Sequence, residues 1–208
     1  MELDITKLPT YWITIESAVE RHDKMNSMFE TLGFENTIQL NGSLMNKEGK
    51  SFMEIQKEKG HLVAECHAKA LVNSGPILVL EDDVWYTDDF DPIVEYKEDT
   101  DAIYLGTSVW GMVNGVSTGG GTRFQKLNES TVKPLNMLGV HSVLYISDDY
   151  KNKTMENMLG AKNNGMIMDE PVAIDMQNHN IICYSRPRFY QQDGHNDYVT
   201  TIPLEVSA

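Results

Sequence analysis

One stretch near the middle of the chain constrains the fold more than any other. Residues 77–80 (Ile-Leu-Val-Leu) form an unbroken apolar run, and three carboxylates follow at once, Glu81, Asp82 and Asp83. An apolar run without alternation is typical of a strand buried on both faces of a sheet. The carboxylates then lie at the carboxyl end of that strand, the edge at which open α/β sheets bind ligands. The same residues are also compatible with a solvated acidic turn after an edge strand.

The pattern of the other segments favours an α/β fold with a mostly parallel central sheet flanked by helices. Apolar, β-branched and aromatic runs predict strands, and apolar residues at helical spacing between N-cap and Gly signals predict helices. A turn is expected at Asn41-Gly42, and Gly33 is expected to end the first helix in a left-handed conformation. The expected strands cover 11–15, 37–40, 77–81, 101–105, 139–147 and 180–184, and the expected helices begin after Ser17 and cover 61–73 and 148–159.

Residues 106–121 differ from the rest of the chain because they are rich in glycine. No Gly-Lys-Ser/Thr follows, so the segment is not a Walker phosphate-binding loop. A mobile lid over a ligand and a plain flexible hairpin both fit such a composition. We favour the lid slightly.

Composition narrows the class of protein and of partner. The 208 residues suit one domain, and no apolar run reaches the ~20 residues of a membrane-spanning helix. The acidic start of the chain lacks the apolar core of a signal peptide, so the cytoplasm is the expected location, and Cys66 and Cys183 are expected to be reduced core thiols. A formal net charge of −14 repels polyanions at long range and lowers the expectation of nucleic-acid binding without excluding it.

Several segments, taken in order, resemble one family. The chain is similar to small members of glycosyltransferase family 25, which contains the lipooligosaccharide glycosyltransferases, and its short length looks like that of phage members. The resemblance rests on Glu20-Arg21 after the first strand, Cys66-His67 in a helix, the acidic strand 78–84, a strand ending at Leu105-Gly106, Pro171–Asp175, and the closing segment 189–197.

The resemblance implies a single GT-A-like domain, with a nucleotide-binding half over about residues 1–106 and an acceptor half over about 107–208. It also implies transfer of a sugar from a nucleotide-diphosphate sugar, expected to be a UDP-sugar, with Mn²⁺ or Mg²⁺ as cofactor. Such a cation acts as a Lewis acid on the leaving diphosphate, and both metals prefer carboxylate oxygens. Transfer would take place in the cytoplasm, which is the host cytoplasm if the protein is phage-encoded.

Site residues can be assigned on this basis. Alternate residues of an extended chain point the same way, so Glu81 and Asp83 share a side. By analogy with Asp-x-Asp sites, Asp83 is the first metal ligand and Glu81 faces the ribose or base, while Asp82 borders the nucleotide site or caps a turn. His195 is the candidate second metal ligand, in competition with Asp193 and Asp197 and with an ordinary exposed loop histidine.

Thr14 and Ile15 end the first strand and are placed in the nucleotide pocket, although simple core packing is preferred for Ile15. Arg21 is a candidate partner for the diphosphate, or an ordinary surface residue. An inverting transfer needs a general base, and the carboxylates around Pro171 are the candidates. Asp169 is the first choice and Asp175 the second, and helix capping is the simpler role for both. His67 reads as a hydrogen-bonded structural histidine.

The acceptor is left open between a saccharide and a hydroxymethylated pyrimidine of phage DNA, which would require a flipped base. The tail Arg186-Pro187-Arg188-Phe189-Tyr190 offers cations and aromatic rings for a nucleic acid, or simply closes the sheet. Two other function classes remain: a non-catalytic metal- or sugar-binding module, and a two-metal phosphoryl-transfer or nuclease fold. The last would need further carboxylates at strand ends, and Asp101 lies at the wrong end of its strand.

Overall fold

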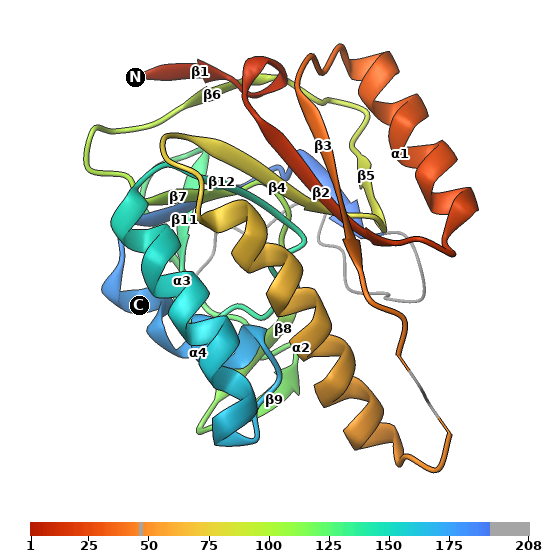
Figure 1. The fold of residues 1–208 in the computed structure, drawn as a ribbon. Helices are drawn as coiled ribbons and strands as arrows, with labels where there is room; N and C mark the ends of the chain where they lie inside the picture. Colours follow the sequence, from red (N-terminus) through yellow and green to blue (C-terminus); the bar gives the residue numbers. More distant parts are fainter. Residues whose placement is uncertain (46–47, 192–208) are drawn as a thin grey trace.

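A central sheet of eight strands organises the structure, a computed structural model that describes residues 1–45 and 48–191 (Figure 1). The spatial order is β10-β11-β13-β7-β12-β4-β2-β3. β4 lies between β12 and β2, and its four apolar residues are fully buried. The acidic stretch therefore follows a central strand rather than an edge strand. The strands are β2 (Thr10–Ile15), β3 (Thr37–Gly42), β4 (Ile77–Glu81), β7 (Ala102–Tyr104), β10 (Phe124–Lys126), β11 (Thr131–Pro134), β12 (Ser142–Tyr145) and β13 (Ile181–Tyr184).

The α/β class is confirmed, but the sheet is mixed rather than parallel throughout. β2, β3 and β4 run parallel to one another, and β7 runs parallel to β13. β12 is antiparallel to both β4 and β7, and β11 is antiparallel to β10 and β13. Parallel neighbours need a long crossover, usually a helix. Helices provide it between β2, β3 and β4, and two further α-helices lie in the long connection from β7 to β13. Between β4 and the first of these helices the chain makes several strands.

The two faces of the sheet are covered differently (Figure 1). On one face, Ile77 and Val79 pack in a cluster with residues of α2, α3 and α4. On the other, Leu78 and Leu80 pack with α1 and with two small antiparallel ribbons, β1–β6 and β5–β14. The helices are α1 (Val19–Leu32), α2 (Phe52–Leu71), α3 (Asp148–Gly160) and α4 (Asp169–Asp175), and the ribbon strands are β1 (Glu2–Asp4), β5 (Val84–Tyr86), β6 (Ile93–Glu95) and β14 (Phe189–Gln191). Short 3₁₀ helices cover Ile5–Lys7, Ala161–Asn164 and Met176–Asn178.

Several element ends differ from the sequence-based expectation. Ala18, not Ser17, is the N-cap of α1 and makes no side-chain cap, whereas Gly33 ends the helix with φ 75° as expected. α2 begins at Phe52 rather than near residue 61, because Ser51 and Glu54 form a reciprocal capping box. The expected turn at Asn41-Gly42 is instead the end of β3, held by parallel pairing with β2.

The glycine-rich segment forms an antiparallel hairpin of β8 (Trp110–Val113) and β9 (Val116–Gly119). Its two-residue turn is Asn114-Gly115, and both residues have positive φ, 50° and 79°. Asn-Gly is the preferred pair for such a turn because its twist matches that of the strands. The segment is thus a hairpin with defined pairing, not an open loop.

Within the described ranges, no helix has the length and apolarity needed to cross a membrane.

Candidate functional site

The end of β4 places two carboxylates of the acidic stretch in one cleft and turns the third away. The backbone N–H of Glu81 donates to His141 O at 2.8 Å, and that of Asp82 donates to Ile13 O at 2.9 Å. These bonds continue the sheet pairing through the motif, so the side chains alternate as in a strand. Glu81 and Asp83 line the cleft, and Asp82 points towards the start of α1.

Asp82 belongs to a polar cluster between β2 and α1. Its carboxylate accepts a hydrogen bond from Thr14 Oγ1 at 2.5 Å and from Arg21 Nη1 at 2.7 Å, and its side chain is only 11% exposed. His22 Nε2 lies 3.1 Å from Thr14 Oγ1 and 3.0 Å from Ile15 O. The preferred core placement of Ile15 is wrong, because the residue is 41% exposed where β2 ends. The cluster brings together the end of β2, the start of α1 and the end of β4.

Glu81 is held in its ionised form by histidines. Burial alone would raise the pKa of its carboxyl, but the hydrogen bond and charge of His67, with smaller contributions from His141 and Lys59, outweigh burial and lower it. His67 is fully buried, and its Nε2 lies 3.2 Å from Glu81 Oε1. His67 thus fixes the orientation of the carboxylate from α2.

Asp83 has the opposite electrostatic environment. Loss of hydration raises the pKa of its carboxyl to about 7, and the negative charges of Glu81 and Asp82 add to that shift. Gln191 at the end of β14 places its amide nitrogen 3.4 Å from both carboxylate oxygens. When Asp83 is ionised, its charge therefore adds to those of Glu81 and Asp82, and Gln191 and Arg21 offset this only in part.

The two candidate bases near Pro171 lie in different surroundings. Asp169, the first residue of α4, lines the same cleft as Glu81 and Asp83. Burial, together with the charge of Glu81, raises the pKa of Asp169 to about 6. Asp175 lies outside the cleft lining and accepts hydrogen bonds from Asn178 at 2.8 Å and Asn157 at 3.1 Å. These bonds and the nearby His179 lower the pKa of Asp175 against the effect of its partial burial.

The cleft has a volume of about 320 Å³ and joins elements from distant parts of the chain. α2 supplies Lys59, α4 supplies Asp169 and Glu170, and the β8–β9 hairpin supplies Trp110 and Ser117. The remaining lining residues are Glu81, Asp83, Ser108, Leu138, Gly139, Val140, Ile167, Met168 and Gln191.

The negative charge of the cleft suits a divalent cation, although the described residues supply only part of a metal-binding set of ligands. Over residues 1–45 and 48–191, no three His, Cys, Asp or Glu side chains converge closely enough to hold a metal by themselves. The raised pKa of Asp83 nevertheless marks an unbalanced anionic site of the kind that hard cations occupy. His195, Asp193 and Asp197, the candidates for a second ligand, lie outside the described residues.

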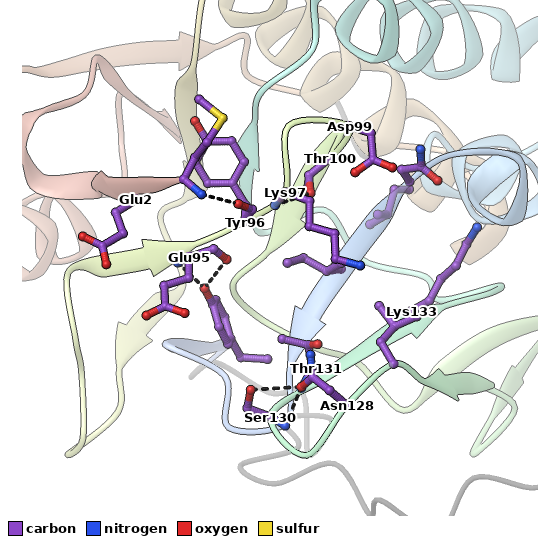
Figure 2. A pocket seen from close by; sticks show the side chains of 16 residues that line it. Glu2, Glu95, Tyr96, Lys97, Asp99, Thr100, Asn128, Ser130, Thr131 and Lys133 are labelled. Atoms are coloured by element: carbon purple, nitrogen blue, oxygen red, sulfur yellow. Dashed lines mark hydrogen bonds between the residues drawn. The ribbon is translucent and has the colours of Figure 1, made fainter.

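A second cavity, of about 580 Å³, lies away from these carboxylates (Figure 2). It is lined by residues of the β1–β6 ribbon, of β11 and of β13. Several of its polar groups bond to one another: the N-terminal amine donates to Tyr96 O at 2.7 Å, and the Tyr184 hydroxyl bonds with the backbone of Glu95. Although larger, this cavity has several of its polar groups already paired with one another. The acidic cleft is therefore the stronger candidate site.

Sequence reasoning missed three residues around the site. Lys59 lies in the part of α2 that was not expected to be helical. His22 directly follows Arg21 at the start of α1, and its place next to a candidate site residue is the signal that could have identified it. Trp110 precedes the Asn114-Gly115 turn signal, which would have identified the hairpin that carries it.

Comparison with known proteins gives only distant likenesses. No family model and no curated protein matches the chain. Similar solved structures include a glycosyltransferase involved in glycosylation of the major capsid of PBCV-1, at 8% identity and a TM-score of 0.48, covering 90% of this chain and 93% of that one. A nucleoside-diphosphate-sugar pyrophosphorylase from Vibrio cholerae is 11% identical with a TM-score of 0.42, covering 86% and 73%. A CTP:phosphocholine cytidylyltransferase from Streptococcus pneumoniae is 11% identical with a TM-score of 0.39, covering 90% and 73%.

Proposed function

We propose that this chain is a metal-dependent glycosyltransferase that moves a sugar from a nucleotide-diphosphate sugar to an acceptor hydroxyl. The observation that carries the proposal is that Glu81, Asp83 and Asp169 line one cleft at the carboxyl end of a central strand. That edge is where α/β sheets bind ligands. The resemblance to family 25 is a supporting argument, and membership of that family stays a prediction because no family model matches.

Asp83 would hold Mn²⁺ or Mg²⁺. Glu81, which the sequence-based assignment placed at the ribose or base, is here proposed as a second ligand because it lines the same cleft. A bound cation supplies charge neutralisation for the leaving diphosphate. His67 keeps Glu81 ionised and oriented for that task through the 3.2 Å hydrogen bond. Hydrogen-bonded outer partners of this kind are a common feature of metal sites.

The neighbouring polar cluster is the proposed nucleotide side of the site. Arg21 is 38% exposed while paired with Asp82, so its guanidinium is accessible to a diphosphate from solvent. Asp82 and Thr14 act by holding the guanidinium in place, and Ile15 offers an exposed apolar contact for the base. UDP is the proposed nucleotide on the strength of the resemblance alone.

Asp169 is the proposed general base for an inverting transfer. The acceptor oxygen forms a bond to the anomeric carbon, and the bond from that carbon to the diphosphate oxygen breaks with its electron pair leaving on the diphosphate. The acceptor proton passes to the Asp169 carboxylate. A carboxyl pKa of about 6 suits this role, because the group is ionised at neutral pH yet basic enough to take a proton. Asp175 is not included, because its carboxylate is occupied by Asn157, Asn178 and His179.

The proposal is tested by incubating the protein with Mn²⁺ and a panel of nucleotide sugars and measuring nucleoside-diphosphate release and product masses. We expect release with at least one donor, and its loss in Asp83→Asn. Glu95→Gln is the matched control, because it alters a carboxylate in the cavity of Figure 2 and should leave the rate unchanged. Failure of every nucleotide sugar to react or to raise the melting temperature would sink the proposal and favour a non-catalytic module.

A further inference from the structure

We propose that Trp110 is a fixed platform for the acceptor, and that the acceptor is a neutral saccharide. This inference rests on the proposed function and assigns the acceptor side of the same cleft. Trp110 is 40% exposed and borders the cleft that contains Asp83 and Asp169. A large aromatic side chain left open beside polar groups is typical of a ligand-binding surface.

The backbone of Trp110 is held on both sides by hydrogen bonds. Its N–H donates to Ser108 Oγ at 3.1 Å. Its carbonyl accepts from the Leu138 N–H at 2.8 Å and from the Thr122 hydroxyl at 2.7 Å. The backbone that carries the ring is therefore held before any ligand arrives, which lowers the ordering cost of binding.

The ring itself rests on the opposite strand of the hairpin. Trp110 pairs with Gly119, and a Cβ atom at Gly119 would lie 3.4 to 3.6 Å from atoms of the indole. The glycine thus gives the ring a flat backbone surface to lie on. One face of the indole is supported in this way, and Ser117, on the same hairpin, adds a hydroxyl to the cleft wall.

Charge selects between the two classes of acceptor. Among the described residues, the cleft is lined by four carboxylates, from Glu81, Asp83, Asp169 and Glu170, and by one lysine, Lys59. A DNA acceptor would bring phosphates towards this excess of negative charge, and DNA binding depends on cationic side chains at the phosphates. A pyranose carries no charge, and its face of C–H groups can stack on an indole while its hydroxyls reach Ser117 and Asp169.

The test measures binding of methyl glycosides of glucose, galactose, mannose and N-acetylglucosamine by saturation-transfer NMR, with Mn²⁺ replaced by Mg²⁺ and with UDP present. At least one glycoside should bind the wild type. Trp110→Ala should weaken that binding about tenfold, and Trp110→Phe should restore part of it. In transfer assays Trp110→Ala should raise the acceptor KM more than it lowers kcat.

Val116→Ala is the matched control, because Val116 is 63% exposed on the same hairpin and lies outside the cleft lining. Thermal unfolding of each variant checks that the fold is kept. The inference is overturned if no glycoside binds, if Trp110→Ala binds glycosides as the wild type does, or if hydroxymethylcytosine DNA is the acceptor. Nucleoside-diphosphate release from the panel of nucleotide sugars is measured separately, and its absence with every donor would remove the proposed function as well.

Discussion

Three adjacent carboxylates have three different environments. Glu81 is kept ionised by His67, Asp82 is bound by Thr14 and Arg21, and Asp83 carries a charge that its neighbours oppose. Net charge alone would treat the three residues as equivalent. Their separate hydrogen-bond partners predict that substitutions at the three positions have effects of different sign.

Asp83→Asn should stabilise the metal-free protein at pH 8. The pKa of Asp83 is about 7 in the folded state against an ordinary value of 3.8, so the folded state binds the proton more tightly. Folding stability therefore falls as pH rises from about 4 to about 7, and the penalty is complete above that range. The variant lacks this penalty, and its melting temperature in EDTA should rise by about 2–4 °C for each kcal/mol gained. A lower melting temperature than the wild type at pH 8 would contradict the charge assignment.

Asp82→Ala should destabilise the protein whether or not a metal is present. The substitution leaves the buried Thr14 hydroxyl and the Arg21 guanidinium without a shared acceptor, and we expect a loss of about 1–3 kcal/mol in urea unfolding. A double-mutant cycle with Arg21→Ala isolates the pair. Additive effects of the two substitutions would show that the contact contributes nothing.

Asp169 should set the acid side of the pH profile for transfer. A base acts as the carboxylate, so kcat/KM should rise as pH increases through about 6 and then level off. Asp169→Asn should lower kcat by about 100-fold or more and remove that limb. Glu170→Gln serves as the comparison, because the Glu170 carboxylate accepts from the Ile167 N–H at 2.8 Å and is engaged within its own turn. An unchanged acid limb in Asp169→Asn would assign the base elsewhere.

At the scale of elements, one buried side chain outside the β8–β9 hairpin helps to hold it in place. Asn136 is 3% exposed, and its amide nitrogen donates to Met112 O at 2.7 Å and to Gly121 O at 3.0 Å. Its amide oxygen accepts from the Arg123 N–H at 2.7 Å. A residue outside the hairpin thus connects β8 to the segment that follows β9, which helps to order this glycine-rich segment.

Asn136→Ala should loosen the hairpin without unfolding the sheet. The Arg123 amide loses its acceptor and should exchange with deuterium faster, whereas the Leu80 amide in β4 should keep its protection. Hydrogen-exchange mass spectrometry reports both in one experiment. Equal protection of Arg123 in variant and wild type would contradict the role assigned to Asn136.

A feature could be predicted from the sequence when residues close to it in the chain determine it, and not when distant residues do. The burial of residues 77–80 and the shared side of Glu81 and Asp83 follow from strand geometry, and the sequence predicted both. The early start of α2 was missed because its Ser51–Glu54 capping box lies outside the apolar stripe. The antiparallel direction of β12 could not be predicted from its own residues, because it depends on which strands β12 pairs with in the sheet. The same reason hid Trp110, whose place in the cleft depends on Asn136 and Leu138, far along the chain.

At the scale of the whole molecule, the sheet separates two cavities of different character. The acidic cleft gathers one end of β4 with α2, α4 and the hairpin, and it carries carboxylates that lack balancing charge. The larger cavity of Figure 2 contains several polar groups that bond to one another. With a net charge of −14 over the chain, an added divalent cation is attracted to the molecule generally, so only a localised measurement distinguishes the cleft from the remaining acidic surface.

The most direct test is a crystal structure of the protein with Mn²⁺ and UDP, using the anomalous signal of manganese to locate the ion. We predict one strong anomalous peak within about 2.5 Å of a carboxylate oxygen of Asp83, with the diphosphate between that ion and Arg21. Crystals of Asp83→Asn grown in the same way should lack the peak. A manganese ion and nucleotide bound in the cavity of Figure 2, or scattered over surface carboxylates with the cleft empty, would contradict the account.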